Sequence, residues 1–105
     1  MAEKIVTTDS SEATSAIFGT FDSNIRIIEE AFNVRIFNKN RDTDDGDVID
    51  VSGDVENVER AVRTLEYLKL MSGAGEVISE SSVEYVVGLV RDNGDEPIEI
   101  GRAHV

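Results

Sequence analysis

The sequence contains no cysteine, so disulfide bonds, thiolate zinc sites and cysteine nucleophiles are excluded. Tryptophan is also absent, and proline occurs once in 105 residues. No apolar run approaches the roughly 20 residues that span a bilayer, and residues 1–9 lack the apolar segment of a secretion signal. The length and the 40% apolar content suit one domain with one core. We therefore expect a single cytoplasmic domain that does not contact a membrane.

Positive charge is scarce, because 10 Lys and Arg stand against 22 Asp and Glu and leave a net charge of −12. This argues against strong nonspecific binding to nucleic acid, which depends on cations that neutralise phosphates. Residues 24–41 are the exception, with four cations and two anions, while the rest of the chain is strongly acidic. The strip is either part of a binding surface or an ordinary set of surface cations. Its cations are Arg26, Arg35, Lys39 and Arg41.

The N-terminal residues predict a short strand followed by a short helix. Residues 3–8 have the composition of a strand, and residues 10–18 carry a narrow apolar face. We expect Asp9 to cap this helix, with Glu12 completing an approximate capping box, and Gly19 to end it.

A second helix is predicted directly after the turn formed by residues 19–22. Either Asp22 or Ser23 can cap it, and Asn33 stands where it must end, because Asn tolerates the left-handed conformation. Its apolar positions recur at helical spacing and should share one buried face. They are Ile25, Ile28 and Phe32.

Two strands are predicted on either side of a polar loop. Residues 34–38 alternate apolar and polar side chains, which leaves Phe37 exposed, and residues 47–52 alternate in the same way around Asp50. The loop between them, residues 41–47, carries an Asp-Gly turn signal, so we expect a hairpin. Its four aspartates fail the EF-hand pattern, and we expect a solvated loop and no metal site.

The C-terminal third predicts two further helices. Residues 55–72 carry the clearest apolar stripe of the chain, with Gly73 as the expected C-cap. Residues 81–91 follow, capped by Ser79, with valines on the inner face. A short strand over residues 97–100 is expected near the end.

This order of elements predicts an α+β fold. Three strands form an antiparallel sheet covered on one face by helices, in the order β-α-α-β-β-α, and one extra helix follows at the C-terminus. No His, Lys or carboxylate is placed to activate a nucleophile, and His104 stands next to the C-terminus. We therefore expect no catalytic site and no enzyme activity in this chain.

The order and the turn resemble the KH domain. Residues 19–36, G-T-F-D-S-N-I-R-I-I-E-E-A-F-N-V-R-I, are similar to its core pattern of a Gly-rich turn, a helix and a β-branched strand. The resemblance covers residues 3–72. It implies a groove that clamps about four nucleotides of single-stranded RNA.

A narrower resemblance is to the N-terminal segment of phosphate-starvation-inducible PhoH-type ATPases. It is carried by F-G-T-F-D-S-N-I-R-I-I-E-E, G-D-V-E-N-V-E-R-A-V-R-T-L-E-Y-L and I-S-E-S-S-V-E-Y-V-V. In that family a KH-like domain precedes a P-loop ATPase domain, and the proteins are linked to ATP binding and RNA metabolism. The resemblance implies a KH-like core at residues 1–72, a connector and appended helix at residues 73–94, and a tail at residues 95–105.

The ATPase part is missing from this sequence. No G-x-x-x-x-G-K-[ST] motif occurs, so the chain has no phosphate cradle of its own. The resemblance therefore implies no cofactor here. ATP and Mg²⁺ belong to a P-loop domain expected in the same polypeptide.

The resemblance places RNA-binding residues in the turn and on its two flanks. The fourth position of the turn departs from the family, because Asp22 stands where a second glycine would allow phosphate to approach. Asp22 as a helix cap and Phe21 as a core anchor are the structural alternative. The RNA-binding set that the resemblance implies is Gly19, Thr20, Phe21, Asn24, Arg26, Arg35 and Lys39.

Two further alternatives stay open for the flanking residues. Arg26 and Arg35 can contact phosphates, or they can pair with Glu29 and Glu30 at the surface. Phe37 can stack on a base or simply cover the end of the core.

Two functions follow. The first is a KH-like accessory domain of a PhoH-type ATPase that binds single-stranded RNA weakly. The second is a degenerate KH domain that docks proteins or forms homo-oligomers without binding RNA.

Overall fold

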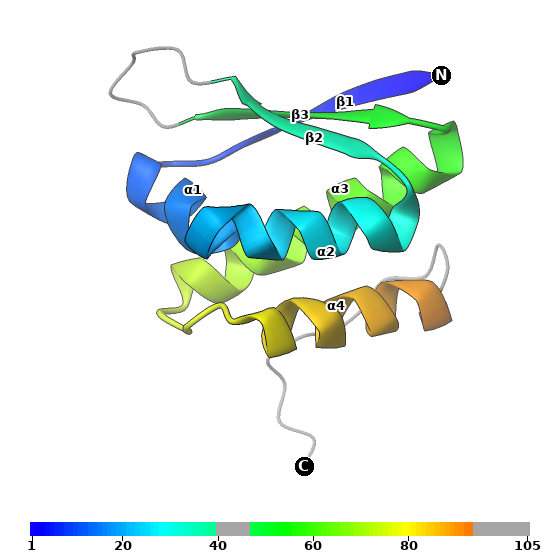
Figure 1. Ribbon diagram of the computed structural model, residues 1–105. Helices are drawn as coiled ribbons and strands as arrows, with labels where there is room; N and C mark the ends of the chain where they lie inside the picture. Colours follow the sequence, from blue (N-terminus) through cyan, green and yellow to red (C-terminus); the bar gives the residue numbers. More distant parts are fainter. Residues whose placement is uncertain (40–46, 94–105) are drawn as a thin grey trace.

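The computed structural model describes residues 1–39 and 47–93, and it confirms the predicted α+β architecture. The three strands form one sheet, and the helices all lie on one side of it (Figure 1). The elements are β1 (Ala2–Thr7), α1 (Ser11–Phe18), the short 3-10 helix η1 (Thr20–Asp22), α2 (Ser23–Phe32), β2 (Arg35–Lys39), β3 (Val48–Gly53), α3 (Val55–Gly73) and α4 (Glu80–Asn93).

The sheet has the order β1-β3-β2, and both pairs of strands are antiparallel. The predicted hairpin pairing of β2 with β3 is therefore confirmed. Because side chains alternate along a strand, the register sorts residues into two faces. The face toward the helices buries Val6, Ile36, Ile49 and Val51. We call the other side, which carries Glu3, Ile5, Phe37, Lys39 and Asp50, the open face.

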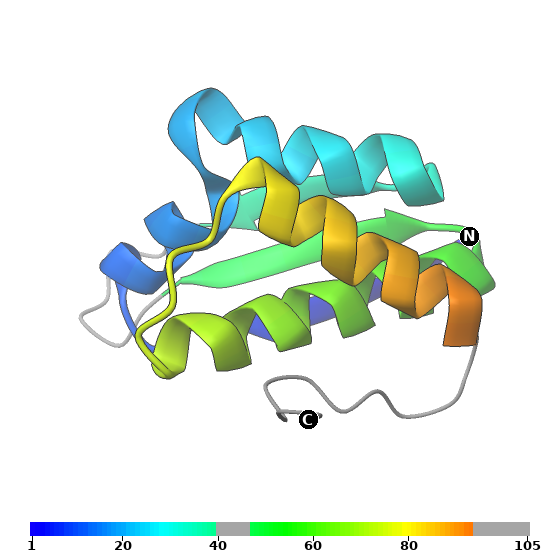
Figure 2. The same ribbon diagram turned by 90° about the horizontal axis from the view of Figure 1, so that it is seen from below.

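Helix α4 forms a third layer beneath α2 and α3, on the side away from the sheet (Figure 1). Seen from below, it lies across both of these helices (Figure 2). The predicted valine face is confirmed, since Val83, Val86, Val87 and Val90 are all buried. Helix α4 therefore closes the lower side of the core.

Arg91 ties the end of α4 to the end of α2. Its Nη2 donates a hydrogen bond to the carbonyl oxygen of Ala31 at 3.0 Å. Its guanidinium carbon also lies 5.9 Å from the centre of the Phe32 ring, within the range of a cation–π contact. A cation at the C-terminus of a helix is stabilising, because it meets the negative end of the helix dipole.

Two of the predicted caps are wrong. Helix α1 is capped by Ser10, whose Oγ accepts from the Ala13 backbone N–H at 3.1 Å, and not by Asp9. At the other end of the fold Gly73 is still helical, and Ala74 is the C-cap of α3. The chain reverses at Gly75 instead, because that residue takes the positive φ of 85°.

Three other predicted ends are confirmed. Gly19 ends α1 with a φ of 80°, and Asn33 ends α2 in the left-handed conformation. Ser79 caps α4, because its Oγ accepts from the backbone N–H of Ser82 at 3.2 Å.

Some predictions fall outside the described residues. They concern most of the polar loop, the strand at residues 97–100, and His104. Within residues 1–39 and 47–93, no helix combines the length and apolar composition needed to cross a bilayer. The same residues contain no cluster of acidic or histidine side chains able to hold a metal ion.

Candidate nucleic-acid interface

The turn between α1 and α2 depends on Gly19. Its φ of 80° and ψ of 178° lie in a region that is almost restricted to glycine. A Cβ atom at this position would lie 2.8 Å from the side chain of Asn24, which is too close for real atoms. Only glycine therefore fits where the chain passes over Asn24.

Phe21 and Asp22 follow with φ values of 54° and 60°, so two successive non-glycine residues are left-handed. This conformation costs about 1–2 kcal/mol per residue. It turns the Phe21 ring outward, and the side chain is 86% exposed. The alternative in which Phe21 anchors the turn in the core is therefore wrong.

The expected capping of α2 is also wrong. Asp22 occupies the N-cap position, but its side chain makes no capping hydrogen bond, and Ser23 already lies inside the helix. Capping requires an extended backbone at this position, whereas Asp22 is left-handed. Within residues 1–39 and 47–93, no side chain therefore caps the first turn of α2.

Asn24 lies directly beneath Gly19 and is only 2% exposed. Its amide nitrogen has no hydrogen-bond partner among the described residues. An unsatisfied buried donor costs roughly 1–3 kcal/mol. The turn thus contains two residues in a costly left-handed conformation. It also covers a buried amide that has no hydrogen-bond partner among the described residues.

A hollow of about 240 Å³ opens beside the turn, between α1 and the ends of β2 and β3. Among the described residues, its lining includes two aspartates and several hydroxyl-bearing residues but no Lys or Arg. It can therefore accept hydrogen bonds from neutral donors more readily than it can hold an anion. The polar residues that matter here are Ser11, Ser15, Asp22, Asn38 and Asp47.

Helix α2 is fixed against the outer edge of β2 by Glu29. Its Oε2 accepts a hydrogen bond from the backbone N–H of Ile36 at 2.9 Å, which satisfies one donor of an edge strand. Arg26 lies three residues earlier, so it shares a side of the helix with Glu29. Arg26 is exposed and lies in the first half of α2, close to the turn.

Arg26 and Arg35 form no ion pair with the described residues. Their proposed pairing with Glu29 and Glu30 is not seen. Arg35, however, is far along β2 from the turn, because it pairs with Ser52, whereas Asn38 at the other end of β2 lines the hollow. The structure thus groups Gly19, Thr20, Phe21 and Asn24 with Arg26 nearby, and it leaves Arg35 apart.

The KH domain model matches residues 7–67, which is more than half of the chain. This chain belongs to the KH domain family. The match includes the turn, both flanking helices and all of β2 and β3. KH domains commonly bind single-stranded RNA, so the family gives this domain an RNA-binding capacity in general terms.

A crystal structure of a protein of unknown function from Aeropyrum pernix resembles this KH domain, with a TM-score of 0.55 and 19% sequence identity. The likeness covers 86% of this chain and 48% of that one, so the KH domain spans about half the length of the solved chain. At this identity the likeness supports the fold alone. No curated protein matches the chain.

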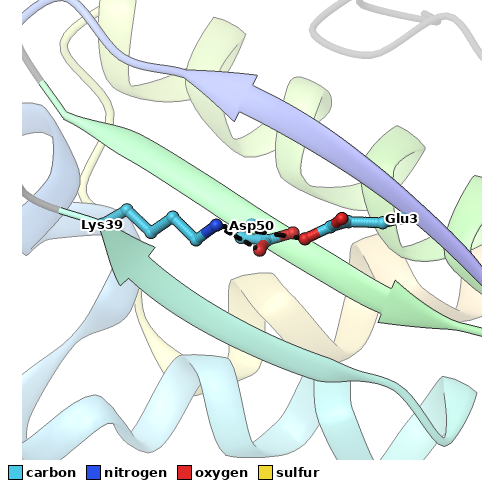
Figure 3. A network of polar contacts seen from close by, with 3 residues as sticks. All are labelled: Glu3, Lys39 and Asp50. Carbon is cyan, nitrogen blue, oxygen red and sulfur yellow. Dashed lines mark ion pairs between the residues drawn. The ribbon is translucent and has the colours of Figure 1, made fainter.

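Lys39, the remaining residue of the predicted set, lies in an ionic network on the open face of the KH domain (Figure 3). Its Nζ is 3.0 Å from Asp50 Oδ2 and 4.0 Å from Glu3 Oε2. Asp50 is only 5% exposed, although strand alternation places it on the open face. The sequence analysis did not predict the burial of Asp50. The signal that could have indicated it is an acidic residue at the centre of a strand.

The two carboxyls shift each other's proton affinity in opposite directions. The hydrogen bond with Asp50 and the charge of Asp50 raise the pKa of Glu3, and Lys39 opposes this. The hydrogen bond from Glu3, followed by that from Lys39, lowers the pKa of Asp50 despite its burial. The pair is therefore most favourable when Glu3 holds a proton and Asp50 does not.

Glu3→Gln is expected to raise the melting temperature at neutral pH, because the amide donates to Asp50 without adding a second negative charge. In the wild type, the raised pKa of Glu3 means that its protonated side chain stabilises the fold. This stabilisation is lost as the pH rises through that pKa. The stabilisation from ionised Asp50 is lost at lower pH, as the pH falls through the lowered pKa of Asp50. This second loss affects the wild type and the variant alike. Thermal melts across the acidic range should show the advantage of the variant vanishing below the pKa of Glu3. An advantage that stays constant with pH, or an equal advantage in Glu84→Gln at an exposed position of α4, would contradict this.

Phe37 is exposed as predicted, at 52%. It lies on the open face, in one cross-strand row with Asp50 and Ile5, which is 55% exposed. This side of the sheet is turned away from the helices and from the turn (Figure 1). Phe37 and the turn therefore do not share one groove.

Proposed function

We propose that this KH domain binds single-stranded RNA weakly, along the side formed by the turn, α2 and the edge of β2. The observation that supports it best is the turn itself. Phe21 and Asp22 hold a strained conformation that neither caps a helix nor packs a side chain into the core. Strain of this kind concentrates at functional sites, where the rest of the fold maintains it.

Charge explains why the binding is weak. Asp22 is exposed, forms part of the turn and lines the hollow, so its carboxylate faces any phosphate that approaches. A pair of like charges 4 Å apart costs about 1 kcal/mol even in water. Arg26 is the exposed cation on the same side, and we propose it as the phosphate contact nearest the turn.

Arg26→Ala is expected to weaken binding of a fluorescent single-stranded RNA about fivefold, roughly 1 kcal/mol. The dependence of affinity on salt should also become shallower, by about 0.7 in the log–log slope for one lost phosphate contact. Fluorescence anisotropy measured over a range of salt concentrations gives both numbers.

The matched control is Lys4→Ala, which removes the same charge from β1 at the opposite edge of the sheet. It should leave the affinity within about twofold, since Lys4 pairs with Glu59 and lies away from the turn. Equal effects of the two variants would mean that only net charge matters. Absence of RNA binding at low salt would favour the second candidate, a protein-docking KH domain, which the half-exposed Ile5 and Phe37 also support.

We further propose that the chain is a non-enzymatic accessory domain of a PhoH-type ATPase, with core, connector and tail as predicted above. The support is that most of the third resembling segment, residues 78–87, lies in α4, a helix added to the KH core. ATP and Mg²⁺ would then bind a P-loop domain encoded in the same polypeptide. The coding sequence beyond Val105 tests this, because a PhoH-type protein must carry G-x-x-x-x-G-K-[ST] there.

A further inference from the structure

We propose that Phe21 stacks on an unpaired base, and that this contact contributes more to RNA affinity than any phosphate contact at the turn. The proposal rests on the RNA binding proposed above and specifies how the same site holds its ligand. The expected ligand is a purine-containing single strand.

The first argument is the placement of the ring. Phe21 is the most exposed of the phenylalanines in the described part of the chain, at 86%, because two left-handed residues lift it off the domain. Folding gains nothing from an aromatic ring in solvent, and a left-handed backbone favours Gly or Asn over Phe. An exposed aromatic ring provides a stacking platform for single-stranded bases.

The second argument is electrostatic. A phosphate on the turn would meet the carboxylate of Asp22, the residue next to Phe21. A base is neutral, so it can lie on the ring without this repulsion. The site therefore favours the base over the backbone of a strand.

The third argument is the chemistry beside the ring. The adjoining hollow offers the exposed carboxylate of Asp22 and the exposed hydroxyls of Ser11 and Ser15 as acceptors. Carboxylates and hydroxyls accept hydrogen bonds from the amino groups of bases. Amino-bearing purines suit these acceptors and also present a large stacking surface.

The test uses the whole chain and labelled single-stranded oligoadenylate. Phe21→Asn removes the ring but keeps a residue that tolerates the left-handed backbone, so the turn should persist. We expect it to weaken binding by roughly ten- to a hundredfold, within the range for loss of one stacked base and more than Arg26→Ala does. A loss no larger than that of Arg26→Ala would contradict the proposal. Phe21→Trp should bind within about threefold of the wild type. Its tryptophan is the only one in the chain, so its fluorescence should be quenched by the oligonucleotide.

A strand of the same length and charge with abasic positions separates stacking from phosphate contacts. It should bind the wild type as weakly as oligoadenylate binds Phe21→Asn. Equal binding of the abasic and intact strands, or unchanged affinity in Phe21→Asn, would overturn the proposal while RNA binding itself stood. A wild type that binds no RNA at low salt would overturn both this proposal and the proposed function.

Discussion

Gly19→Ala is expected to lower the free energy of unfolding by about 3 kcal/mol, as measured by urea denaturation. Two costs combine at this position. The backbone region is almost restricted to glycine, which costs an alanine about 1–3 kcal/mol. The added Cβ would also lie 2.8 Å from Asn24, which is 2% exposed and has little room to move.

Alanine substitutions at two other glycines separate the backbone cost from the steric cost of the added Cβ. Gly75 has a φ of 85° but open space around it, so Gly75→Ala should show the backbone cost alone, about 1 kcal/mol. Gly88 lies in α4 with no atom near its missing Cβ, and Gly88→Ala should stabilise by about 0.5–1 kcal/mol. If all three variants changed stability alike, Asn24 would not be packed beneath Gly19 as described.

Val86→Asp is expected to lower the free energy of unfolding by about 4 kcal/mol or more. Val86 is fully buried between α4 and the helices above it. The substitution loses about 1.5–3 kcal/mol of apolar burial and places a carboxylate where nothing compensates its charge. This is a large part of the total stability of a domain, about 5–15 kcal/mol, so much of the population should unfold.

Tyr85→Asp is the matched control, because it adds the same charge one residue away at a position that is 65% exposed. It should change stability by less than about 1 kcal/mol. Similar curves for Val86→Asp and Tyr85→Asp would show that α4 is dispensable and that residues 1–72 fold without it. A large difference would show that α4 is a structural layer of this KH domain.

Side-chain periodicity predicted the elements well, because it reflects a local geometric requirement. The stripe in α3 and the valines of α4 recur at 3–4 residue spacing, which places them on one side of a helix. Alternation placed Ile49 and Val51 on the buried side of β3 in the same way. Local spacing was sufficient for these features.

The caps were less predictable, because a cap depends on backbone angles that several neighbouring residues can satisfy. Asp9 and Ser10 are both good N-cap residues, and only the structure shows that Ser10 has the extended backbone. Asp22 has the right side chain for a cap but the wrong backbone, since the turn forces it to be left-handed. The exposure of Phe21 follows from the same turn.

Asp50 shows a different limit of sequence reasoning. Alternation alone places it on the open face and suggests exposure. Its burial depends on Glu3 and Lys39, which are distant in sequence and are brought together by the pairing of β1 and β2 with β3. The same network engages Lys39, which the sequence suggested for phosphate binding.

The central claim is that the turn and the neighbouring edge of β2 form the RNA-binding side of this domain. Amide NMR spectra recorded during a titration with single-stranded RNA test it residue by residue. The account predicts shifts in residues 19–26 and at Asn38, the β2 residue that lines the hollow, with little change in Phe37, β1 or α4. Shifts concentrated around Ile5 and Phe37 on the open face, with the turn unaffected, would contradict it.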